Sequence, residues 1–169
     1  MSELSERPIR RLSAGDVFAY KAIRLEALKV APEAFASTYD SEVARDDAHF
    51  ENRVETGCVF GAFVGDRVVG MAGFYQESGK KSAHKGVLWG MYVTPEWRHA
   101  GFGHALVSAV LDHARGRVDL VNLYVVTENT AALDLYRKAG FREYGVEARA
   151  FKLDDRYVSE TFMVCDLDG

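Results

Sequence analysis

The chain has 169 residues, of which 48% are apolar and 27% charged, and its formal net charge is −4. This length and composition fit one domain with a sizeable core, so we expect a single domain over residues 1–169. The mild negative charge and the lack of clustered lysines and arginines argue against nucleic-acid binding, and the absence of a long apolar run argues against a membrane partner and favours a cytoplasmic protein.

The N-terminal third is predicted to contain one strand and two helices. Ile9–Leu12 has a strand pattern, and Ser13 to Asp16 resembles a capping box that opens a helix toward Val30. Pro32 ends this helix because proline cannot continue the hydrogen-bond ladder. Residues 36–39 then form a loop, and residues 42–54 are expected to form one helix.

The central part alternates strands and helices. A tight turn at Gly65-Asp66 joins two β-rich runs into an antiparallel hairpin. A polar loop, a strand, a helix and another strand follow, and this βαβ unit predicts two parallel neighbouring strands with a right-handed crossover. The expected ranges are strands 58–64 and 67–75, loop 77–85, strand 87–93, helix 101–117 and strand 120–126, with Phe102, Leu106, Ala109, Val110 and His113 on the helix stripe that faces the sheet.

The C-terminal part is predicted to be a helix and a long hairpin. Asn129 caps the helix, Gly140 ends it, and strands 141–152 and 157–166 flank a turn at Asp154-Asp155. The two cysteines, Cys58 and Cys165, lie in apolar runs, so we expect buried free thiols and no metal site.

The segment from Val93 to Leu106 carries the main functional signal. A strand ends at Pro95, and Gly101 and Gly103 flank the start of the next helix. Unpaired N–H groups and the helix dipole make such a helix start an anion site, and glycines allow phosphate oxygens to approach the backbone. Glycines also cap helices for structural reasons alone, so this spacing is a weak signal by itself.

Other nucleotide-binding patterns fit this segment poorly. In a dinucleotide-binding module, a third glycine would stand where Leu106 is, and an acidic residue would end the next strand. A P-loop would need an upstream glycine at the right spacing and a hydroxyl residue directly after the lysine that follows Gly79, but Lys80 is followed by Lys81. Zinc-ligand spacing and a Gly-x-Ser-x-Gly elbow are also absent from the sequence.

Two motifs together resemble the GNAT superfamily of acyl-CoA-dependent N-acetyltransferases. Motif A is carried by Val93, Pro95, Arg98, Gly101 and Gly103, and motif B by the pattern Asn-x-x-Ala-x-x-Leu-Tyr-x-x-x-Gly-Phe over residues 129–141. The resemblance implies a mixed α/β fold with a mostly antiparallel sheet of about seven strands. Two central parallel strands splay apart at a bulge, and about four helices flank the sheet.

The resemblance also implies an acetyl-CoA site. The splayed strand would bind the pantetheine arm through its backbone, as an added strand does, and the helix start would hold the pyrophosphate. Alternatively, Arg98 and His104 are ordinary surface side chains, and Asn129 is only a helix cap. The implied contact residues are Met91, Tyr92, Val93, Arg98, His99, Ala100, Gly101, Phe102, Gly103, His104, Asn129 and Tyr136.

The same resemblance assigns catalytic roles. Tyr136 would protonate the departing CoA thiolate, and a backbone N–H, assigned to Tyr92, would stabilise the oxyanion. The acceptor ammonium must first lose a proton, for which Glu42, Glu77 and His84 are the candidate bases. No motif supports any of these three bases, and each also fits a solvated surface group. Tyr136 equally fits a half-buried tyrosine packed on Phe141.

The implied activity is direct acetyl transfer from acetyl-CoA to a primary amine, small or peptidic, in a ternary complex. A CoA-binding sensor of the same fold is the alternative, and the acceptor's identity and the oligomeric state stay open, a homodimer being compatible with the family. The first two helices, their loop and the last hairpin would form the acceptor pocket. Its candidate residues are Phe35, Ser37, Tyr39, Trp89, Phe151 and Tyr157, with Arg149 beside them.

Overall fold

The computed structural model describes residues 8–168, which form one seven-stranded sheet with five α-helices. The strands are β1 (Ile9–Arg11), β2 (Cys58–Val64), β3 (Arg67–Gln76), β4 (Lys85–Val93), β5 (Leu120–Val126), β6 (Arg142–Leu153) and β7 (Arg156–Asp166). The helices are α1 (Val17–Val30), α2 (Tyr39–Val43), α3 (Asp47–Thr56), α4 (Phe102–Ala114) and α5 (Thr130–Lys138). The sheet order is β1-β2-β3-β4-β5-β7-β6, and only β4 and β5 are parallel.

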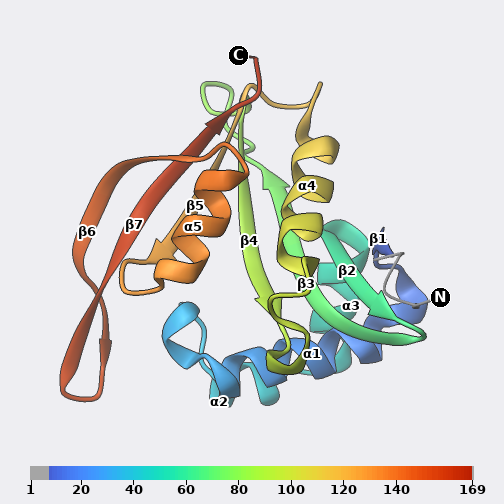
Figure 1. Cartoon of the computed structure of the whole chain (residues 1–169). Helices are drawn as coiled ribbons and strands as arrows, with labels where there is room; N and C mark the ends of the chain where they lie inside the picture. Colours follow the sequence, from blue (N-terminus) through green and yellow to red (C-terminus); the bar gives the residue numbers. More distant parts are fainter. Residues whose placement is uncertain (1–7, 169) are drawn as a thin grey trace.

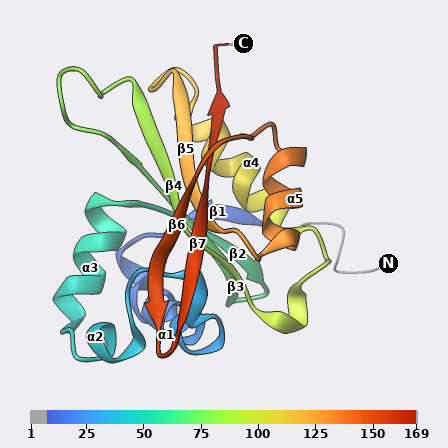
Figure 2. The ribbon, with the colours of Figure 1, turned by 90° about the vertical axis from the view of Figure 1, so that its left-hand side faces the viewer.

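Helices cover both faces of the sheet. Figure 2 shows α4 and α5 on one side and α1, α2 and α3 on the other. Each side has its own core. One is centred on buried residues of α4 such as Leu106 and Val110, and the other on Tyr20 and Ile23 of α1 and Phe50 of α3. The expected mixed α/β fold is therefore confirmed.

The first predicted helix agrees with the structure, whereas the second predicted helix does not. Ser13 donates its N–H to Asp16 at 2.8 Å, a 3-10 turn leads into α1, and α1 ends at Val30 before Pro32. The single helix predicted over residues 42–54 is instead two helices, because Asp46 accepts a hydrogen bond from the N–H of His49 and starts α3 anew. This break is why the fold has five α-helices rather than about four.

The predicted hairpins and the crossover are confirmed. Gly65 adopts a positive φ of 57° in the turn between β2 and β3, and β4 and β5 are parallel. Within α4, Phe102, Leu106 and Val110 are buried as expected, while His113 is only half-buried and packs its ring edge-on against two phenylalanine rings. Both cysteines are buried free thiols.

The two parallel strands separate soon after they meet. Only residues 85–87 of β4 pair with β5, at residues 120–122. Further along β4, the register against β3 gains one residue between Trp89 and Tyr92, and Gly90 within this bulge has a φ of 64°. In Figure 1, β4 diverges from the β5–β7 side of the sheet toward its carboxyl end. The predicted splay and bulge are therefore confirmed.

Candidate active site

The start of α4 presents a row of unpaired backbone donors. Gly101 is the N-cap with a φ of 85°, and Ala105 is the first residue of the helix to donate its N–H, to the Gly101 carbonyl at 3.1 Å. Within residues 8–168, the N–H groups of residues 99–104 have no hydrogen-bond acceptor. A helix start of this kind fits the diphosphate of a coenzyme.

The glycines of this loop have different structural roles. The positive φ of Gly101 favours glycine directly, whereas a Cβ on Gly103 would lie 3.2 Å from a methyl carbon of Leu135 and 3.4 Å from the Met91 methyl. Gly103 therefore allows α4 to approach α5 and β4 closely. The exposed His99 also has a positive φ, 62°, which a side chain with a Cβ adopts only at some cost.

Arg98 ties the loop back to the end of β4. Its Nε donates to the Val93 carbonyl at 3.0 Å, and its guanidinium lies 5.7 Å from the centre of the Tyr92 ring. The Tyr92 hydroxyl in turn donates to Glu26 at 2.9 Å. Arg98 is thus hydrogen-bonded to the end of β4. Its predicted contact with a pyrophosphate stays a prediction.

The backbone of β4 changes the expected oxyanion donor. Thr94 donates its N–H to the Val69 carbonyl of β3. Because N–H groups alternate between the two edges of a strand, the amide of Tyr92 also points toward β3, and those of Met91 and Val93 point toward the open side. The donor role assigned to the Tyr92 backbone stays a prediction, and this alternation adds Met91 and Val93 as candidate donors on the open side.

Tyr136 lies in the core between the sheet and α5. It is only 6% exposed, its ring packs edge-on against Phe141 with centroids 5.8 Å apart, and burial raises the pKa of its hydroxyl above the ordinary value of 10. Burial is the only cause of this shift, and the hydroxyl has no hydrogen-bond partner among the side chains of residues 8–168. It is therefore a protonated donor without a side-chain partner.

Asn129 has the structural role that the sequence left open. Its side-chain oxygen accepts the N–H of Ala132 at 3.2 Å, so it caps α5. The amide nitrogen of the same side chain is not used in that cap. The cap and a contact to pantetheine are thus compatible.

The three candidate bases are placed unfavourably. Glu42 is buried and bound by two arginines: burial alone raises its pKa, but the hydrogen bonds and charge of Arg24 and the charge of Arg53 outweigh this effect and lower the pKa to about 2. Glu77 pairs with Lys85, and His84 precedes β4. Both lie at the closed end of the strand pair. Along β4, the distance to Gly90 is about 17 Å from Lys85, the partner of Glu77, and about 20 Å from His84, at ~3.3 Å per residue.

Part of the predicted acceptor pocket comes together beside these arginines. Phe35 packs against the Arg24 guanidinium at 5.0 Å, and Arg53 lies 5.7 Å from the centre of the Trp89 ring. Ser37 is a further neighbour of Glu42. The sequence reading missed both arginines, although Arg24 stands out as a charged residue within the apolar stripe of α1.

The other predicted acceptor residues make their contacts away from these arginines. Tyr39 lies under the Lys29 ammonium at 4.4 Å. Tyr157 packs with Arg149 near the tip of the last hairpin, where Phe151 faces Val158 across the strands. Their acceptor role stays a prediction.

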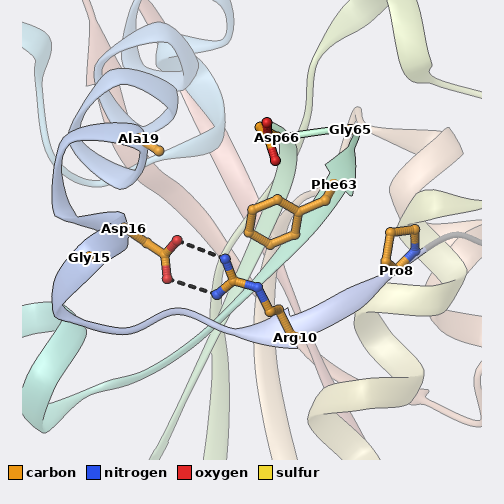
Figure 3. A pocket seen from close by; sticks show the side chains of 8 residues that line it. All are labelled: Pro8, Arg10, Gly15, Asp16, Ala19, Phe63, Gly65 and Asp66. Carbon is orange, nitrogen blue, oxygen red and sulfur yellow. Dashed lines mark hydrogen bonds and ion pairs between the residues drawn. The ribbon is translucent and has the colours of Figure 1, made fainter.

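A separate hollow lies away from this site. About 450 Å³ opens between β1, the start of α1 and the β2–β3 turn (Figure 3), three strands away from the splayed pair. Arg10 and Asp16 neutralise each other there through two hydrogen bonds of 2.8 Å, and Arg10 stacks on Phe63 at 4.2 Å. The other charged residue that lines this hollow is the exposed Asp66, so the hollow offers no cation to the diphosphate of a coenzyme.

Neither a metal site nor a membrane-spanning helix is found in residues 8–168. No cluster of three or more histidine, cysteine, aspartate or glutamate side chains has the arrangement of a metal site. No helix in this part of the chain is both long and apolar enough to cross a membrane.

Comparison with known proteins decides the family. A family model described as the acetyltransferase (GNAT) family matches residues 23–141. The chain belongs to this family. GNAT proteins are acyltransferases that use acetyl-CoA, and the matched region contains α4, the splayed β4 and motif B.

Individual relatives agree with this assignment. The chain is 37% identical over 93 residues to the N-alpha-acetyltransferase RimI of Mycobacterium tuberculosis, covering 55% of this chain and 57% of that protein, so it spans about half the length of this curated relative. A GNAT acetyltransferase structure from Streptococcus pneumoniae matches with a TM-score of 0.86, 19% identity and coverage of 96% and 99%. The structure of yncA from Salmonella typhimurium with its cofactor acetyl-CoA matches with a TM-score of 0.80, 23% identity and coverage of 98% and 96%.

Proposed function

We propose that residues 1–169 form one N-acetyltransferase domain that moves the acetyl group of acetyl-CoA to a primary amine by direct attack in a ternary complex. The observation that carries this proposal is the opening between β4 and β5, which lies beside the unpaired amides at the start of α4. The free buried thiols are in keeping with a cytoplasmic location. The N-alpha-acetyltransferase activity in the name of the relative supports an amine acceptor.

Backbone groups would hold the donor. The N–H groups of residues 99–104 bind the diphosphate, and the open edge at Met91 and Val93 binds the pantetheine arm. Bound acetyl-CoA supplies a thioester whose carbonyl carbon is open to an amine. An N–H on the open edge of β4 stabilises the charge that develops on the carbonyl oxygen, an effect worth about 3 kcal/mol per donor in enzymes of this kind.

Tyr136 would complete the transfer as the acid. Its hydroxyl has no side-chain partner within residues 8–168, and burial raises its pKa further above neutral, so it carries its proton at pH 7. It gives its proton to the sulfur as the carbon–sulfur bond breaks, while the amine nitrogen loses a proton as the amide forms. Because Glu42 is held by two arginines, we propose that the amine proton leaves through water rather than to that carboxylate.

The first experiment is a thermal-unfolding scan with acetyl-CoA, CoA or NAD. At about a hundred times the dissociation constant, a real site adds about 2.7 kcal/mol to the free energy of unfolding and raises the midpoint by several degrees. A shift with both CoA species but not with NAD supports the proposal. No shift with either CoA species contradicts it.

A second experiment separates an enzyme from a CoA-binding sensor. The Tyr136→Phe variant should release CoA thiol at least tenfold more slowly while acetyl-CoA still shifts its unfolding midpoint as in the wild type, since only the proton donor is lost. Tyr124→Phe, at a half-exposed tyrosine of β5, is the matched control. Full activity of Tyr136→Phe refutes the acid role, and a wild type that binds CoA but acetylates no amine is a sensor.

A further inference from the structure

A buried arginine lies against the bulge of β4. Arg24, on α1, is 4% exposed and binds Glu42 of α2 with two of its nitrogens: Nε donates at 3.0 Å and Nη2 at 2.7 Å. The third nitrogen, Nη1, makes no hydrogen bond to any residue in the range 8–168. A Cβ built on Gly90, in the bulge, would lie 3.8 Å from this Nη1. One donor face of a buried cation is thus free beside the opened strand.

The charges around this arginine do not cancel. Glu42 also accepts from Nη1 of Arg53 at 3.3 and 3.4 Å, so two cations surround one carboxylate. We call these three side chains the Arg24–Glu42–Arg53 cluster, and its net charge is +1. Glu42 balances the buried Arg24, so the surplus positive charge lies on Arg53, whose side chain is 26% exposed. An anionic group that reached the free Nη1 face of Arg24 would balance this surplus charge.

The location of the cluster matches the acceptor side of the proposed site. The start of α4 lies on the face of the sheet that α4 and α5 cover, so the coenzyme enters the opening between β4 and β5 from there. The acceptor then approaches from the opposite face, where α1, α2 and α3 pack. Arg24, Phe35 and Trp89 lie on that face beside the bulge.

We propose that Arg24 determines acceptor specificity by binding a carboxylate of the acceptor through its free Nη1 face. The acceptor class is therefore a small primary amine that carries a carboxylate, such as an α-amino acid, and not a polycation. A guanidinium suits this task because its planar array of donors matches a carboxylate. This inference rests on the proposed acetyltransferase function and names its substrate class.

The test compares matched acceptors. The twenty common α-amino acids, their α-carboxamides and spermidine are assayed with acetyl-CoA by release of CoA thiol. The wild type should acetylate at least one amino acid with a kcat/KM about tenfold or more above that of its carboxamide, because the amide cannot pair with the cation. Preference for carboxamides or for spermidine overturns the inference.

Two variants assign the preference to Arg24. In Arg24→Gln, the ratio of kcat/KM for acid over amide should fall about tenfold, mainly through the KM of the acid, whereas a purely structural role lowers both rates equally and leaves the ratio unchanged. Arg24→Lys keeps a positive charge beside Glu42 and is the variant to test if Arg24→Gln does not fold. In Arg24→Lys the ratio of kcat/KM for acid over amide should also fall, because the planar guanidinium is lost. Arg115→Gln, at an exposed arginine after α4, is the control.

The remaining outcomes separate this inference from the proposed function. If acetyl-CoA raises the unfolding midpoint but no amine of the panel is acetylated, the acceptor inference is refuted and donor binding stands. If acetyl-CoA does not bind, both fail. An unchanged ratio of acid over amide in both Arg24 variants refutes the role of Arg24 alone.

Discussion

Replacing Glu42 by glutamine tests how strongly the Arg24–Glu42–Arg53 cluster stabilises the fold. Glutamine has nearly the same shape but no charge, so Arg24, 4% exposed, loses its buried counter-ion. Removing one partner of a buried ion pair typically costs about 3–5 kcal/mol. The fall of the Glu42 pKa from 4.5 to about 2 corresponds to about 3 kcal/mol and agrees with the lower end of that range.

The same pKa predicts how the effect depends on pH. Well above pH 4.5 the carboxyl group is charged in both the folded and the unfolded chain, and its full contribution to the free energy of unfolding is present. As the pH falls from 4.5 toward 2, the unfolded chain takes up the proton first, so the contribution is progressively lost. Glu42→Gln should therefore be less stable than the wild type by about 3 kcal/mol at pH 7, and the difference should shrink toward pH 2.

Urea unfolding between pH 2 and pH 7, followed by fluorescence of the two tryptophans, measures this difference. Glu96→Gln is the matched control, because Glu96 pairs with Arg67 on the surface with both side chains more than half exposed. That variant should lose less than about 1 kcal/mol. A loss of similar size in both variants at pH 7, or a constant difference between wild type and Glu42→Gln across this pH range, would refute the reasoning.

Two further predictions concern the coenzyme loop and α5. His99→Gly should raise the free energy of unfolding by about 0.5–1 kcal/mol in the same urea assay, because glycine adopts the φ of 62° without strain; a loss of stability would show that the histidine side chain makes a compensating contact. Asn129→Ala should cost about 1 kcal/mol through loss of the cap on α5, and Asn129→Asp should restore it. If the aspartate variant restores stability but binds acetyl-CoA more weakly in the thermal scan, the amide nitrogen contacts the coenzyme, and unchanged binding leaves Asn129 as a cap alone.

Much of the fold can be predicted from local sequence signals. The turn at Gly65-Asp66, the cap at Asn129 and the apolar stripe of α4 each act within a few residues, so they appear where the sequence predicts them. The break between α2 and α3 was missed because the helical pattern of residues 42–54 continues through it. Asp46 can serve as a helix residue or as a cap, and tertiary packing selects the cap.

The site is harder to predict from the sequence, because its chemistry depends on the orientation of backbone amides and on side chains that are distant along the chain. The motifs predict that residues 91–93 contact the coenzyme, but only the strand pairing indicates which of their amides face the opening, and by alternation the Tyr92 amide points toward β3. Glu42 resembles a surface carboxylate in the sequence. Its burial and low pKa arise from Arg24 and Arg53, which lie 18 and 11 residues away along the chain.

The Arg24–Glu42–Arg53 cluster connects the stability of the fold to the choice of acceptor. An apolar cluster of similar volume is often as stable as a buried ion pair, so stability alone does not explain a buried cation with one free donor. Glu42 fixes the Arg24 guanidinium through two hydrogen bonds, and this leaves Nη1 at the bulge in a set direction. A guanidinium held in this way loses little conformational freedom when it binds a carboxylate, so the ion pair that stabilises α1 against α2 also preorganises the acceptor side of the site.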